Sequence, residues 1–144
     1  MFKTMFAATV TLILLANTGQ AGDYDLVMKS AIIKDSKANG KGWDAFGNAP
    51  DPFVTAGIKQ GKGFSKTGST EVDSDTFRPD WNKTVLTVDV GDDIVIQVWD
   101  KDVSFDDPIG EYKFTITKKM IEDGETRVSF EQVKELRFVL RVAK

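Results

Sequence analysis

The chain has 144 residues and a formal net charge of −3, and it contains neither cysteine nor histidine. This composition excludes disulfide stabilisation, zinc sites ligated by Cys or His, and nucleophilic catalysis of the Ser-His-Asp or Cys-His type. The mild acidity also argues against a nucleic-acid partner, because phosphate binding requires clustered basic side chains.

Residues 1–21 have the layout of a secretory signal peptide. Lys3 provides a basic start, residues 5–16 are almost wholly apolar, and small residues stand one and three positions before a cut after Ala21. The apolar run is short for a transmembrane helix, so a membrane anchor or a buried strand is the less favoured alternative. We therefore expect export to a periplasm or out of the cell, with a single domain over residues 22–144. Residues 1–21 contain one basic residue, Lys3, and no acidic residue, so their removal would change the formal charge from −3 to −4.

The pattern of the remaining chain predicts short strands separated by polar turns. The clearest signals are two neighbouring stretches in which side chains alternate between two faces, with Gly91 and Asp92 as the turn between them. Residues 118–123 are expected to form one helical turn that ends at Gly124. The expected strands are Asp25–Ile33, Pro52–Lys59, Gly63–Ser69, Thr84–Val90, Asp93–Trp99, Glu111–Thr117, Thr126–Phe130 and Glu135–Val142.

Eight strands without a long helix predict an all-β fold. An antiparallel β-sandwich is the natural way to bury one face of each strand. A barrel fits the same alternation almost as well. The mature chain is expected to be a monomer.

Aspartates gather in two loops, and the second of these directly follows the most apolar strand. Two carboxylates about 4 Å apart repel each other by roughly 4 kcal/mol at an effective dielectric constant of 20, so a bound cation would stabilise such a cluster. Calcium suits oxygen ligands in flexible geometry, whereas soft metals need the missing Cys or His. Simple solvation of acidic loops remains the alternative. The candidate ligands are Asp44 and Asp51 in the first loop, and Asp100, Asp102, Asp106 and Asp107 in the second.

Four ordered stretches resemble motifs of the C2 domain family. They are residues 51–54, 78–82, 98–102 and 107–111, which read DPFV, RPDWN, VWDKD and DPIGE. The resemblance covers nearly all of residues 25–144. It implies an eight-stranded antiparallel β-sandwich of C2 type, in the topology with one strand before the first calcium-binding loop.

The resemblance also implies a set of calcium ligands at one end of the sandwich. The matching positions are Asp44, Asp51, Asp100, Asp102 and Asp107, assisted by the carbonyl groups of Trp43 and Lys101. The last acidic loop is one residue shorter than the family pattern, so Asp106 replaces or joins Asp107. In the middle acidic loop, Asp75 is a further candidate, although a solvated turn is favoured there.

The family resemblance implies a calcium-dependent module that binds anionic phospholipid membranes. Phe46, Phe105 and Val103 lie at the expected loop tips, where apolar side chains would enter the membrane interface. The alternative for the two rings is that they fold back over the base of the loops. A second functional hypothesis is a secreted protein- or polymer-interaction module in which calcium only stabilises the loops. An enzyme using paired carboxylates is the least favoured hypothesis, because the chain lacks histidine and the family is generally not catalytic.

Overall fold

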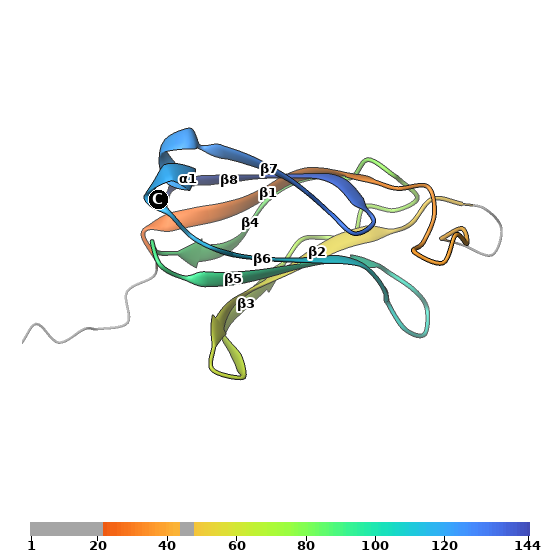
Figure 1. Ribbon diagram of the computed structural model, residues 1–144, viewed down its shortest axis with the longest axis horizontal. Coiled ribbons are helices and arrows are strands. Elements are labelled where there is room, and N and C mark those ends of the chain that lie inside the picture. Colours follow the sequence, from red (N-terminus) through yellow and green to blue (C-terminus); the bar gives the residue numbers. More distant parts are fainter. Residues whose placement is uncertain (1–21, 44–47) are drawn as a thin grey trace, which may run out of the picture.

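A computed structural model describes residues 22–43 and 48–144. The expected signal peptide, Asp44 and Phe46 therefore lie outside the described residues. Two four-stranded antiparallel sheets pack face to face (Figure 1). This confirms the β-sandwich and excludes the barrel.

The strand order in one sheet is β4-β1-β8-β7 and in the other β3-β2-β5-β6. One strand, β1, precedes the first acidic loop, as the predicted topology requires. The elements are β1 Tyr24–Ile33, β2 Pro52–Gln60, β3 Gly63–Ser69, β4 Asp80–Val88, β5 Asp93–Asp100, β6 Asp107–Thr115, α1 Lys118–Asp123, β7 Glu125–Phe130 and β8 Val133–Val142.

The core lies between the two sheets and is built from alternate residues of the central strands. In β5, Ile94, Ile96 and Val98 point inward, and each is at most 1 % exposed. They face residues such as Leu26 of β1 and Phe138 of β8, which are fully buried. Each such side chain contributes roughly 1.5–3 kcal/mol relative to an exposed one. Because no disulfide is present, this packing supplies most of the stability.

Two strands start four residues earlier, and end two residues earlier, than the sequence pattern indicates. We expected β6 to begin at Glu111, but it begins at Asp107 and contains Pro108. Proline lacks an N–H, yet β6 is an edge strand, and its pairing with β5 shifts register between Val98 and Trp99, so the missing donor is tolerated. Strand β4, also at an edge, begins at Asp80 instead of Thr84, through an irregular start that the period-two pattern does not reveal.

The short helix α1 forms where it was predicted. The Thr117 side chain accepts a hydrogen bond from the Met120 N–H at its start. Gly124 ends it at a φ of 76°, a conformation that favours glycine. The described residues contain no helix long and apolar enough to cross a membrane.

The two ends of the sandwich differ in what they carry. Helix α1 lies at one end, and there the Ala143 N–H donates to the Asp23 carbonyl oxygen at 2.9 Å, so both ends of the described chain lie together (Figure 1). Residues 34–43, 48–51, 70–79 and 101–106 lie in loops at the opposite end, which we call the loop end.

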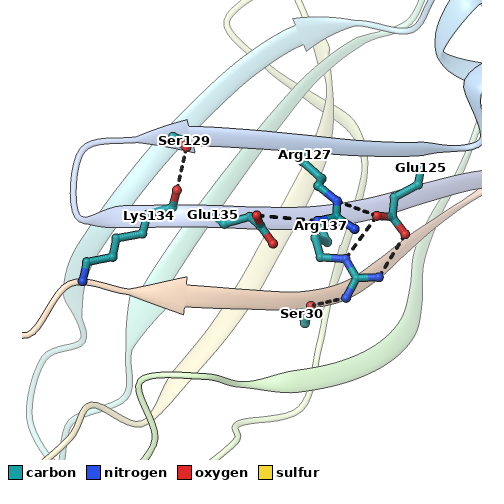
Figure 2. A network of polar contacts seen from close by, with 7 residues as sticks. All are labelled: Ser30, Glu125, Arg127, Ser129, Lys134, Glu135 and Arg137. Atoms are coloured by element: carbon teal, nitrogen blue, oxygen red, sulfur yellow. Dashed lines mark hydrogen bonds and ion pairs between the residues drawn. The ribbon is translucent and has the colours of Figure 1, made fainter.

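A network of charged side chains crosses β7, β8 and β1 (Figure 2). The Glu125 carboxylate accepts hydrogen bonds from Arg137 Nη2 at 3.0 Å and from Arg127 Nε at 2.8 Å. Arg137 also reaches Ser30 on β1. Hydrogen bonds from Arg137 and Arg127 lower the pKa of Glu125 to about 2.

This shift predicts a contribution to acid stability. The folded pKa of Glu125 lies below its ordinary value of 4.5, so the contribution is fully present above pH 4.5 and is lost as the pH falls towards about 2. We expect Glu125→Gln to lower the melting temperature near neutral pH and to reduce its decline over that acid range. Glu122→Gln on α1 is the control, and thermal unfolding followed by circular dichroism is the measurement. Parallel curves for Glu125→Gln and wild type would contradict the assignment.

Candidate metal centre

The strand register brings three acidic positions together at the loop end. Asp100 is the last residue of β5, the strand that lies between β2 and β6. Its register partners are Pro52 on β2 and Asp107 on β6. Asp51 immediately precedes Pro52, so the antiparallel pairing places Asp51, Asp100 and Asp107 side by side at one edge. Directly opposed residues, here Asp100 and Asp107, have Cα atoms roughly 4.5–5.5 Å apart in an antiparallel pair.

Hydrogen bonds join the first and last acidic loops. The Asp51 N–H donates to Asp100 Oδ1 at 2.8 Å. The Lys101 N–H donates to the Asp51 carbonyl oxygen at 2.9 Å. These hydrogen bonds hold the backbone on both sides of the Asp100 carboxylate in place.

Asp100 is the electrostatic centre of the site. It is only 5 % exposed, and with Thr70 it makes up the buried polar residues of the described chain. Burial raises the pKa of the Asp100 carboxyl, and the Asp51 N–H opposes this rise. The carboxylates of Asp51, Asp102 and Asp107 raise the pKa further. A cation among these groups would offset both the desolvation cost of the Asp100 carboxylate and its repulsion by the other carboxylates.

The middle acidic loop supports Asp51 through its backbone. Asp75 has a φ of 54°, and its N–H donates to Asp51 Oδ1 at 2.7 Å. The Asp75 carboxylate accepts from the Ala49 N–H at 3.2 Å. The Thr76 N–H donates to the Pro50 carbonyl oxygen at 2.9 Å. The sequence indicated Asp75 as a secondary candidate ligand, but it did not reveal this positioning of Asp51 by a backbone N–H.

Asp106 and Asp107 are neighbours in sequence but face different groups. Asp106 Oδ1 accepts from the Asp102 N–H at 3.0 Å and lies 3.5 Å from Lys101 Nζ, so it closes its own loop. Asp107 Oδ2 lies 2.7 Å from Lys37 Nζ. Of the two, Asp107 is the one adjacent to Asp100 across the strand pair.

Lys37 is a member of the site that the sequence analysis missed. Its ammonium group lies between Asp107 and the Trp43 ring, with 5.9 Å from Nζ to the ring centroid. Trp43 is 4 % exposed, and its Nε1–H donates to the Lys34 carbonyl oxygen at 2.8 Å. Nothing in the local pattern separates Lys37 from Lys34 or Lys41, so only the path of the folded loop identifies it.

The donors that are present fit a hard divalent cation. They are carboxylate and carbonyl oxygens, which suit calcium. Within residues 22–43 and 48–144, no three acidic side chains converge closely enough to hold a metal ion in their present arrangement. Asp44 lies outside those residues, and Asp107 is engaged by Lys37. The fit therefore rests on the buried Asp100 carboxylate, which like charges surround.

The tip of the last acidic loop is apolar. Phe105 is 85 % exposed and Val103 is fully exposed. The Phe105 ring therefore does not fold back over the base of its loop, in contrast to the alternative considered for it. Phe46, the matching candidate in the first loop, lies outside the described residues.

Comparisons with known proteins agree with this geometry. The family model described as "C2 domain" matches residues 27–133. Synaptotagmin-5 of Arabidopsis thaliana is 35 % identical over 83 residues, which are 56 % of this chain but only 14 % of that protein. The present chain therefore spans a small part of the curated relative that it matches.

Solved structures show the same fold at low sequence identity. A single C2 domain of plant Extended Synaptotagmin 1 has a TM-score of 0.56 and 16 % identity, over 86 % of this chain and 97 % of that one. A calcium-bound structure of the paired C2 domains of Extended-Synaptotagmin 2 has a TM-score of 0.55 and 15 % identity, over 85 % of this chain and 47 % of that one. Human GIVD cytosolic phospholipase A2 has a TM-score of 0.56 and 18 % identity, over 87 % of this chain and 18 % of that one. Together with the sandwich topology, the family match shows that this chain belongs to the C2 domain family.

Proposed function

We propose that this chain is a calcium-dependent binding module whose loop end attaches to anionic phospholipid membranes. The observation that carries the proposal is the buried Asp100 carboxylate, which is fixed by the Asp51 N–H and surrounded by other carboxylates. C2 domains commonly bind calcium, and those of synaptotagmin type bind phospholipid membranes or proteins.

Each acidic residue has a distinct part in holding the ion. Strand β5 fixes Asp100, and hydrogen bonds from Lys101 and Asp75 fix Asp51. Asp102 and Asp107 lie near the two ends of the last loop, and their carboxylates would turn towards the ion. The family resemblance adds Asp44 as a further calcium ligand, and Asp106 would replace or join Asp107. When bound, calcium supplies the positive charge that these oxygens lack.

The charge balance of the loop end explains why membrane binding would depend on calcium. Residues 34–43, 48–51, 70–79 and 100–107 carry nine acidic and five basic side chains, so this end is negative and repels anionic lipid. A divalent cation removes that repulsion. The exposed Phe105 and Val103 can then enter the interface, where burial of a phenylalanine ring contributes roughly 1.5–3 kcal/mol.

The proposed role is binding and not catalysis, and the proposed location is outside the cytosol. The signal-peptide pattern of residues 1–21 supports export. Extracellular calcium modules work with dissociation constants of roughly 10⁻⁴–10⁻³ M. A site of that strength would be occupied most of the time and would act as a lasting attachment.

Calcium titration of Asp100→Asn tests the metal site. Asparagine keeps an acceptor for the Asp51 N–H but removes the buried charge, so the calcium-free melting temperature should stay the same or rise. Calcium affinity measured by calorimetry should fall at least about tenfold, which corresponds to about 1.4 kcal/mol. Asp93→Asn, at the other end of β5, is the control and should bind like wild type. No binding by wild type, or equal binding by Asp100→Asn, would refute the site.

Sedimentation with phosphatidylserine-containing liposomes tests the membrane role. Wild type should sediment with calcium and stay in solution with a chelator. Phe105→Ala should weaken liposome binding roughly tenfold because it removes the buried ring, and it should leave calcium affinity unchanged. Phe64→Ala is the matched control, since Phe64 is a half-exposed ring on β3. A calcium-dependent melting temperature without liposome binding would instead support a protein- or polymer-interaction module.

A further inference from the structure

The Lys37 side chain is held more tightly than a typical surface lysine. It is 28 % exposed, whereas the other lysines in the ion pairs found within the described ranges are 47–80 % exposed. Its Nζ lies 2.7 Å from Asp107 Oδ2 and also experiences the charges of Asp100 and Asp102. Lys37 therefore places a positive charge among the same carboxylates that the metal site uses.

The loop that carries Lys37 is organised to hold it there. The Lys37 N–H donates to the Lys41 carbonyl oxygen at 2.8 Å, and the Gly40 N–H donates to the Lys37 carbonyl oxygen at 2.9 Å. Gly40 has a φ of 79°, which makes this tight turn possible. The buried Trp43 anchors the following residues and places its ring near the ammonium group.

We infer that Lys37 is an internal counter-ion of the metal site, which competes with calcium and thereby sets the calcium concentration at which the module loads. This inference rests on the proposed function. In the calcium-free protein the ammonium group neutralises part of the carboxylate cluster through Asp107. Calcium at the same carboxylates would repel the ammonium, so the Lys37 side chain must leave Asp107 for the ion to bind.

The chemistry of the two cations makes such an exchange feasible. Lysine carries a single compact charge on a flexible four-carbon stem, so its ammonium can swing into water while the Lys37 backbone stays in place. One ammonium cannot neutralise the whole cluster, so calcium retains a favourable site. Lys101 contributes less, because it is 55 % exposed and lies 3.5 Å from Asp106, whose carboxylate accepts from the Asp102 N–H.

Lys37→Met is expected to destabilise the calcium-free protein and, at the same time, to strengthen calcium binding. Without calcium, its melting temperature should fall below that of wild type because the carboxylates lose their counter-ion. Its calcium dissociation constant, measured by calorimetry, should become roughly two- to fivefold lower, which is the range expected for loss of one partly exposed ion pair. A purely structural role would lower the melting temperature without tightening calcium binding.

Two further variants make the test specific. Lys118→Met removes the same charge from α1, at the opposite end of the sandwich, and should leave calcium affinity close to wild type. Lys37→Arg keeps the charge, so it should lack the gain in calcium affinity expected for Lys37→Met. Unchanged affinity in Lys37→Met, or an equal gain in Lys118→Met, would overturn the inference while leaving the proposed function intact. Absence of calcium binding by wild type would overturn both.

Discussion

The organisation of the loop end depends on one buried charge at the end of a central strand. Asp100 continues the inward-facing series of Ile94, Ile96 and Val98, so it occupies a position where an apolar residue would be expected. A carboxylate at such a place is costly unless hydrogen bonds or cations offset its desolvation. The Asp51 N–H provides the first compensation and Lys37, through the neighbouring Asp107, provides part of the second.

The two sheets make this arrangement possible because the residues that stabilise the fold lie between the sheets, whereas the acidic residues lie at the loop end. Apolar residues of β1, β8, β2 and β5 fill the space between the sheets and hold the strand register. The same register aligns the start of β2 and the start of β6 with the end of β5. The described parts of the acidic loops therefore take their relative positions from a rigid scaffold, and the proposed ion would require only their side chains to move.

Much of the fold and part of the site could be predicted from sequence for identifiable physical reasons. The central stretch that ends at Asp100 alternates cleanly, because both of its faces are defined by the sandwich. The edge strands β4 and β6 were predicted too short, since irregular starts and Pro108 hide the alternation there. Lys37 could not be predicted, because its contact joins positions 70 residues apart and depends on how the loop turns at Gly40.

The placement of the two ends of the described chain has a consequence for how the domain would be oriented on a surface. Asp23 and Ala143 are bonded to each other at the α1 end, and the loop end lies across the full length of the sandwich (Figure 1). A polypeptide joined at either end would therefore stand away from whatever the loops contact. If the loop end attaches to a membrane as proposed, a segment joined at the α1 end would lie on the side of the domain remote from that membrane.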